Sequence, residues 1–263
     1  MGCSVMKAST NKIIIVIIIA TLLSLSVSNA SILGSLQEPD DNLEMYFPFE
    51  MLVVQDRDLL DMANEVMNDN MVVNTSFKNA EAYYNIKNID WDMMISDSPT
   101  TYSLFLHGLN PVFFLIYAYN RNNNNDYLDR ATEIIKSWTD YSNQENINVY
   151  AWNDHAVALR LTNLLYYTAV LKSKNIKIPL EIMDVIKTDT EWLNNDENYT
   201  FKHNHGVSQD IALIKGSVLL ENADYLNHAI ERLNTQLAYA FPNKYIHIEN
   251  TPAYRSRNAV CRK

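Results

Sequence analysis

The sequence predicts an all-α protein built of antiparallel helical hairpins, and three observations support this. Glycine and proline are scarce, at 5 and 7 of 263 residues, which argues against an all-β protein with many tight turns. From residue 101 onward, apolar side chains recur at the three- and four-residue spacing of one helix face. Short polar stretches separate these segments, and short connections favour antiparallel neighbours.

The first 30 residues have the features of a secretory leader. Lys7 and Lys12 precede an apolar run from Ile13 to Leu25, and small residues up to Ala30 suit cleavage there. The run is shorter than the ~20 residues that a spanning helix prefers. We therefore expect a secreted or periplasmic protein with no stable membrane insertion after cleavage, and an uncleaved anchor is the alternative. The sequence leaves the oligomeric state open.

Residues 31–100 form an N-terminal region that is expected to be less regular. Residues 31–54 include SLQEPDDN, which suggests a linker. The stretch QDRDLLDMANEVMND, residues 55–69, predicts a first helix. Residues 70–100, rich in Asn, Asp and aromatic side chains, are expected to be irregular.

Residues 101–263 carry the regular helical pattern. Helices are expected at 101–120, at 127–142, at 154–172, at about 180–194, around the stripe Val207, Ile211, Ile214 and Val218, and around the stripe Leu226, Ile230, Leu233 and Leu237. The helical period stops after Phe241. No strict internal repeat is present, which argues against a tetratricopeptide-type solenoid.

Charge and cysteine content exclude several classes of function. The formal net charge of −10 argues against non-specific nucleic-acid binding, although a local basic cleft can still hold an anionic ligand. Cys3 leaves with the leader and Cys261 then stands alone, so no internal disulfide is expected. No Cys/His cluster has structural-zinc spacing and no Gly-rich phosphate loop appears, so we expect no metal or cofactor.

Four stretches, taken together, carry a family resemblance. They are YSLFLHGLNPVFFLIYAY (102–119), YAWNDHAVALRLTNLL (150–165), FKHNHGVSQDIALI (201–214) and YIHIENTPAYRSR (245–257). In their order and spacing they resemble the helical domain of the heparinase II/III-like and alginate-lyase polysaccharide lyases. The resemblance implies an incomplete (α/α) toroid. Because the chain ends at Lys263, the family's C-terminal β-sandwich is expected to be lacking.

The resemblance also implies site residues. Asn204 and His205 match an Asn-His pair that serves the chemistry in such lyases, and Tyr254 matches their tyrosine. The family often has His directly after that tyrosine, where this chain has Arg255. These enzymes cleave acidic, uronate-containing polysaccharides by β-elimination, so an acidic polysaccharide is the expected partner.

The chemistry explains why these residue types are suitable. A base removes the C5 proton beside the uronate carboxylate, and the bond to O4 then breaks. Asn204 and His205 can neutralise the carboxylate by hydrogen bonding. Tyr254 can act as base and acid, provided that cations such as Arg255 and Arg257 lower its pKa.

Further family-like positions are expected to line the cleft and bind substrate, at Tyr102, His107, Trp152 and Arg160, beside Arg255 and Arg257. Two of these positions, His107 and Arg160, also have a plainer reading. His107 is a candidate for an ordinary structural histidine. Arg160, which follows Asp154 on one predicted helix, is a candidate for a buried ion pair that holds helices together.

The Asn-His stretch also has plainer readings. Asn204 is a natural helix N-cap, His205 is a candidate for an ordinary satisfied histidine, and His203 is expected to be exposed to solvent.

Three functions therefore stand side by side. The first is a secreted polysaccharide lyase that acts by β-elimination. The second is a catalytically inactive glycan-binding remnant of such a lyase. The third is a toroid glycoside hydrolase, which needs two carboxylates across its cleft; Asp154, Asp210 and Glu249 are available, but their spacing singles out no pair.

Overall fold

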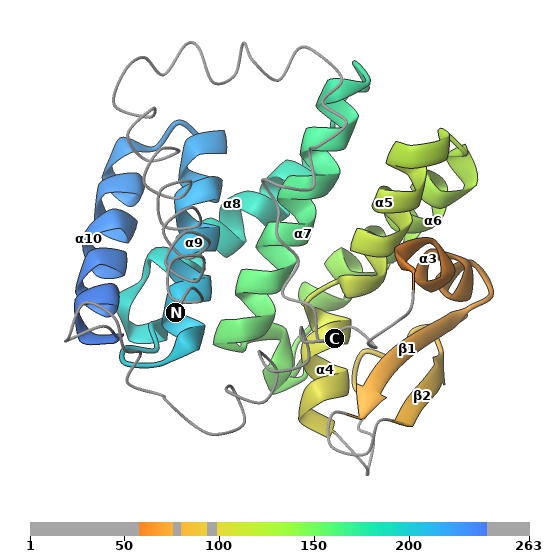
Figure 1. Ribbon diagram of the computed structural model, residues 1–263, viewed down its shortest axis with the longest axis horizontal. Coiled ribbons are helices and arrows are strands. Elements are labelled where there is room, and N and C mark those ends of the chain that lie inside the picture. Colours follow the sequence, from red (N-terminus) through yellow and green to blue (C-terminus); the bar gives the residue numbers. More distant parts are fainter. Residues whose placement is uncertain (1–57, 76–79, 94–98, 241–263) are drawn as a thin grey trace, which may run out of the picture.

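The computed structural model describes residues 58–75, 80–93 and 99–240, and it is predominantly helical (Figure 1). The leader, the linker and everything after residue 240, including Tyr254, Arg255 and Arg257, lie outside the described residues. The elements are α3 (Leu59–Met67), β1 (Asn70–Thr75), β2 (Ala80–Asn85), α4 (Pro99–His107), α5 (Asn110–Asn122), α6 (Asn125–Ser142), η2 (Val149–Trp152), α7 (Asp154–Ser173), α8 (Leu180–Asn194), η3 (Asp196–Asn198), α9 (Asn204–Leu219) and α10 (Ala223–Ala240).

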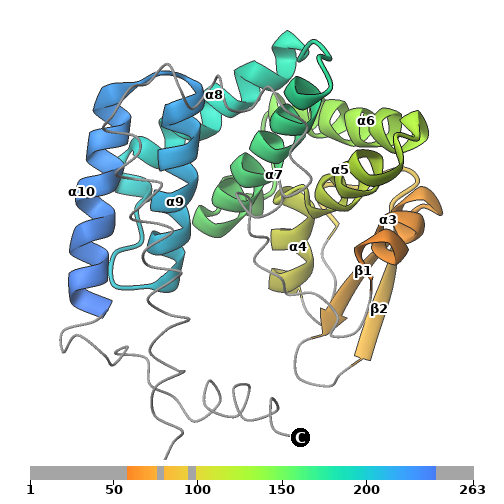
Figure 2. The same ribbon diagram turned by 45° about the horizontal axis from the view of Figure 1, so that its top comes forward.

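The helices form an arc of two layers. Helices α5, α7 and α9 pack side by side in that order, and α6, α8 and α10 pack against them, with α6 and α10 each touching α8. Figures 1 and 2 show α9 and α10 as an antiparallel hairpin at one end of the arc, and α5 and α6 toward the other. This arrangement confirms the prediction of an all-α, toroid-like fold made of antiparallel hairpins.

Helix α7 is the centre of the arc. Asn153 caps it, because its side chain accepts hydrogen bonds from the backbone N–H groups of His155 and Ala156. Nearly every residue from Ala156 to Leu171 is buried, as expected for a helix with neighbours on all sides. The cap and the packing of α7 together fix where its first residue, Asp154, lies.

The segment predicted as one helix at 101–120 is two helices, α4 and α5. Leu109 between them has a φ of 55°, and Pro111 follows at the start of α5. A left-handed residue breaks the helical path, and a proline is well suited to a first helical turn. The periodic apolar pattern runs through both helices, which is why it did not reveal the break.

The prediction that residues 70–100 are irregular was wrong for their first half. Strands β1 and β2 pair antiparallel, from Asn70 opposite Asn85 to Thr75 opposite Ala80. Met71, Val72 and Val73 are buried, so this β-prone run anchors the hairpin on the core. The hairpin lies beside α3 (Figure 1). Asp58 caps α3, which begins later than the predicted residue 55.

The buried face of α9 also differs from the predicted stripe. Val207, Ile211, Ile214 and Val218 are each only half-buried, while Gln209 and Asp210 are fully buried. The polar side chains are inside because they serve the hydrogen-bond network described below. None of the helices in the described ranges is both long and apolar enough to cross a membrane.

Candidate functional site

The first turn of α9 presents Asn204 and His205 at one end of the helix arc. His203, and not Asn204, caps the helix: its Nδ1 accepts a hydrogen bond from the backbone N–H of His205 at 3.3 Å. Asn204 is the first helical residue and is exposed, as is His203. The Asn204 side-chain amide therefore does not serve as the helix N-cap.

His205 is held by a carboxylate from the start of α7. Its Nδ1 lies 3.1 Å from Oδ2 of Asp154, and the Thr200 hydroxyl donates to the same oxygen at 2.5 Å. Burial opposes ionisation of Asp154, but hydrogen bonds from His205 and Thr200, together with the His205 charge, hold the pKa of this carboxyl below its usual range. An ionised carboxylate can only accept, so Nδ1 of His205 carries the proton in this contact.

That contact determines the chemistry left to His205. With Nδ1 donating to Asp154, Nε2 is an acceptor when the ring is neutral and a donor when it is protonated. Two more imidazoles meet this ring edge-on, from His155 at 4.5 Å and from His203 at 4.3 Å between ring centroids. Within the described ranges, no group of histidine, cysteine and acidic side chains is arranged to hold a metal ion.

Two buried glutamines fix the loop that leads into α9, and no sequence pattern had indicated either of them. Gln209 accepts from the Thr200 N–H at 2.9 Å and donates to the Asn198 carbonyl at 2.8 Å. Gln236 of α10 accepts from the Lys202 N–H at 2.9 Å and donates to the His203 carbonyl at 2.6 Å. Each glutamine satisfies both sides of its amide on the loop backbone, which preorganises the site.

The loop also depends on Gly206. A Cβ at this position would lie 2.4 Å from the Thr200 carbonyl oxygen and 3.2 Å from the Tyr199 hydroxyl. The loop thus folds back onto the helix start at a distance that only glycine allows, and this brings Thr200 to Asp154.

A buried ion pair supports the loop from behind. The Tyr199 hydroxyl donates to Asp210 at 2.8 Å, and Arg232 of α10 donates to the other oxygen of Asp210 at 2.8 Å. Burial raises the pKa of Asp210 to about 6, although Arg232 and Tyr199 oppose this shift. Burial and the nearby Asp210 raise the pKa of Tyr199 further above its usual value, so it remains a neutral donor.

Three of the predicted substrate contacts are in the core. Tyr102, His107 and Arg160 are 2%, 0% and 0% exposed. Burial, and then the charge of Arg160, lower the pKa of His107 to about 4, so it is neutral near pH 7. Tyr102 packs edge-on against Tyr84 at 4.7 Å. In the described part of the structure, these side chains pack against other side chains.

Arg160 forms a buried ion pair that holds helices together, which was its plainer reading, and its partner is Asp189. It donates to both carboxylate oxygens of Asp189 on α8, at 3.0 and 2.6 Å, and not to Asp154. Its other nitrogen bonds the carbonyls of His107 and Ala151, and the guanidinium stacks 4.0 Å over the Trp138 ring. The pair therefore ties α7, α8, α4 and η2 together.

Trp152 is half-buried. Among the predicted substrate contacts that lie in the described residues, it is the one that keeps some exposed surface. It packs against Trp138 and Trp192 at 6.4 and 6.2 Å and lines a hollow of about 390 Å³ beside Glu181 and Asp184. These two exposed carboxylates give the hollow an acidic wall.

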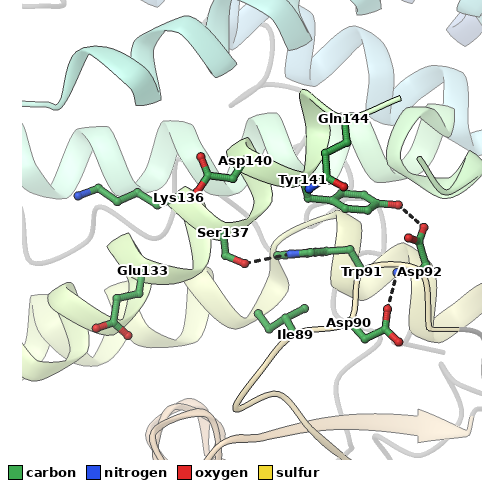
Figure 3. Close-up of a pocket in the computed structure, with 10 residues that line it drawn as sticks. All are labelled: Ile89, Asp90, Trp91, Asp92, Glu133, Lys136, Ser137, Asp140, Tyr141 and Gln144. Atoms are coloured by element: carbon green, nitrogen blue, oxygen red, sulfur yellow. Dashed lines mark hydrogen bonds between the residues drawn. The ribbon is translucent and has the colours of Figure 1, made fainter. Parts of the chain in front are cut away.

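A larger hollow lies elsewhere, between residues 89–92 and α6 (Figure 3). It measures about 620 Å³, and its wall carries four carboxylates and one lysine, at Asp90, Asp92, Glu133, Asp140 and Lys136. The Trp91 and Tyr141 rings stack at 6.0 Å, and their polar atoms are bonded to Ser137 and Asp92. The excess of negative charge disfavours an acidic polymer here.

Two of the three carboxylates considered for a hydrolase already have hydrogen-bond partners within the protein. Asp154 is bonded to His205 and Thr200, and Asp210 to Tyr199 and Arg232, while Glu249 lies outside the described residues. The geometry therefore gives no support to Asp154 and Asp210 as an acid–base carboxylate pair.

Comparisons with known proteins give one informative match. No protein-family model and no curated protein matches the chain. Among solved structures, it is similar to a crystal structure of a mutant of the heparan sulfate lyase HepC from Pedobacter heparinus, with a TM-score of 0.62 and 15% sequence identity. The match covers 88% of this chain and 38% of that one, so the chain spans well under half of the lyase's length. At this identity the match shows a shared helical fold.

Proposed function

We propose that this chain is a polysaccharide lyase that cleaves a uronate-containing acidic polysaccharide by β-elimination. The observation that carries the proposal is the Asn204–His205 pair at the start of α9, with His205 oriented by Asp154 at 3.1 Å. The toroid-like fold shared with a heparan sulfate lyase supports it. The leader-like residues 1–30 support secretion, which brings such an enzyme to its polymer.

The proposed reaction begins by neutralising the uronate carboxylate. The Asn204 amide donates to one oxygen, and the protonated Nε2 of His205 donates to the other, which makes the C5 proton more acidic. The N-terminus of α9 adds partial positive charge at the same place. Nε2 carries a proton only in the cationic ring, and the ionised Asp154 at Nδ1 is the counter-charge of that cation.

Elimination then needs a base and an acid. In the proposal, Tyr254 takes the C5 proton, the C5–H electron pair forms the C4=C5 double bond, and the C4–O4 bond breaks. Tyr254 returns a proton to O4, so one group serves both steps. Arg255 and Arg257 are adjacent cations that would favour the phenolate.

The test is the ultraviolet absorbance of the unsaturated product, measured with the purified chain and a panel of uronate polymers. We expect a rise that falls by about 10²- to 10⁴-fold in His205→Ala and in Tyr254→Phe, and clearly in Asn204→Ala. Asn234→Ala, at an exposed position on α10, is the matched control and should keep full activity. No absorbance rise from a folded chain with any uronate polymer would sink the proposal. Binding without turnover would then point to a glycan-binding protein.

A further inference from the structure

A patch of aromatic rings and one lysine lies directly before the Asn204–His205 pair. We call Phe201, Lys202 and Tyr239 the 201 patch. The Phe201 and Tyr239 rings are 5.9 Å apart, and the Lys202 ammonium lies 5.5 and 4.9 Å from their centroids. Phe201 is 45% exposed, unusually high for a phenylalanine. Two rings and a cation therefore share one exposed surface.

The charge of Lys202 has no carboxylate partner in the described part of the chain. Its ammonium is held over the two rings by cation–π attraction, which is worth little at an exposed site and leaves the donors open. The chain carries a formal net charge of −10, and Lys202 places one positive charge on this surface.

Lys202 in the 201 patch is held in a strained backbone conformation. Lys202 has a φ of 63°, a left-handed conformation that lysine rarely adopts. Gln236 maintains it by accepting from the Lys202 N–H and donating to the His203 carbonyl. Because Gln236 and Tyr239 are both on α10, the last turns of α10 fix the Lys202 backbone and supply a ring.

The 201 patch directly precedes the proposed site in the chain, and residues 201–204 are all exposed. Phe201 and Lys202 are followed at once by His203, Asn204 and His205, and Figure 2 shows the start of α9 beside the end of α10. A polymer held at His205 would therefore extend over the 201 patch with its neighbouring sugar.

We propose that the 201 patch is a subsite for a sugar that carries a carboxylate or a sulfate, next to the sugar held by Asn204 and His205. The apolar C–H face of the sugar stacks on the Phe201 and Tyr239 rings, and the Lys202 ammonium pairs with the negative group. A neutral sugar would stack on the rings but would leave the Lys202 ammonium without an anionic partner. This inference rests on the proposed function for its polymer, and its test separates the two.

The test measures binding of fluorescently labelled oligosaccharides by anisotropy. The ligands are an alginate oligosaccharide, which carries only carboxylates, a heparan sulfate oligosaccharide, which adds sulfates, and an uncharged cello-oligosaccharide. The parent proteins are the wild type and Tyr254→Phe, which keeps the proposed binding groups. The variants are Lys202→Gln, Phe201→Ala and, as a matched control, Lys187→Gln, whose side chain is 64% exposed on α8.

We expect Lys202→Gln to raise the Kd for a charged oligosaccharide about fivefold and to flatten its salt dependence. Phe201→Ala should raise the Kd by about two- to tenfold, and Lys187→Gln should match the parent. Tighter binding of the alginate ligand would assign the anion as a carboxylate, and tighter binding of the heparan sulfate ligand would assign it as a sulfate. Either result supports the subsite.

Other outcomes overturn the inference. It fails if both patch variants bind as the parent does, if the neutral ligand binds as tightly as the charged ones, or if no charged oligosaccharide binds. If the wild type turns over a polymer and the patch variants have the same KM, the subsite proposal is wrong and the lyase proposal stands. If binding depends on the 201 patch but no polymer is turned over, the lyase proposal is wrong and the subsite proposal stands.

Discussion

Nδ1 of His205 lies 3.1 Å from Oδ2 of Asp154, so the first turns of α9 and α7 are joined through one imidazole. The two residues are 51 positions apart in the sequence. Their contact makes the start of α9 part of the rigid arc, and it fixes which nitrogen of His205 faces a ligand.

Asp154→Asn should reduce turnover without removing the imidazole. The amide can donate as well as accept, so the tautomer of His205 is no longer fixed and its cationic form loses its partner. We expect the rate to fall by about 10²-fold or more, measured as product absorbance, with circular dichroism to check the fold. Asp184→Asn, at an exposed position on α8, is the control. An unchanged rate in Asp154→Asn would show that the carboxylate does not orient the catalytic ring.

Asp154 should also contribute to the pH dependence of stability. Its pKa is lower in the folded protein than its ordinary value of 3.8, so its ionised form stabilises the fold above about pH 4. That contribution is lost as the pH falls below about 4. We expect urea unfolding to show a stability gap between wild type and Asp154→Asn near pH 6 that narrows in acid. A gap of constant size from pH 6 to pH 3 would contradict the shift.

The sequence predicted much of the helical part of the fold. The helices expected at 127–142, 154–172 and 180–194 correspond to α6, α7 and α8. Asn124 and Asn153, which cap α6 and α7, are residues that commonly stop one segment and start the next. The β-hairpin and the break at Leu109 escaped because both are decided by backbone conformation and long-range packing, which an apolar period does not record.

The site was predicted only in part, and for a physical reason. The stretch around Asn204 and His205 stood out as polar residues at a helix start. The side chains that position it do not stand out. Gln209 and Gln236 resemble surface glutamines, yet both are fully buried on α9 and α10. Their role depends on which loop carbonyl and N–H groups come within reach, and that follows from the folded arrangement alone.

Gly206→Ala should destabilise the protein and disturb the site. Alanine is the better helix former by about 1 kcal/mol, but its Cβ would lie 2.4 Å from the Thr200 carbonyl oxygen. We expect a net loss of roughly 1–3 kcal/mol in the free energy of unfolding, with a further loss of turnover because Thr200 moves from Asp154.

Gly216→Ala is the control for that variant. Its Cβ would meet the Thr190 side-chain oxygen at 2.5 Å, away from the residues of the site. It should lower stability and leave the turnover of the folded fraction unchanged. A stabilised Gly206→Ala protein would show that the loop is not closely packed on α9.

The last prediction separates the two readings of Arg160. The Arg160–Asp189 pair is fully buried, so Arg160→Met and Asp189→Leu should each cost about 3–5 kcal/mol, since each leaves one buried charge without its partner. The double variant should cost less than the sum of the two, because it leaves neither charge behind. Arg130→Met, which breaks a half-exposed pair with Asp69, should cost only about 1 kcal/mol.

Unfolding in urea gives these free energies, and turnover at saturating and at low substrate gives KM. A core role predicts a strongly coupled stability cycle and, in whatever fraction stays folded, an unchanged KM. A substrate-binding role predicts the reverse, with a raised KM and little coupling to Asp189. The second outcome is difficult to reconcile with a guanidinium that already donates to Asp189 and to two backbone carbonyls, because binding an anion would require it to abandon them.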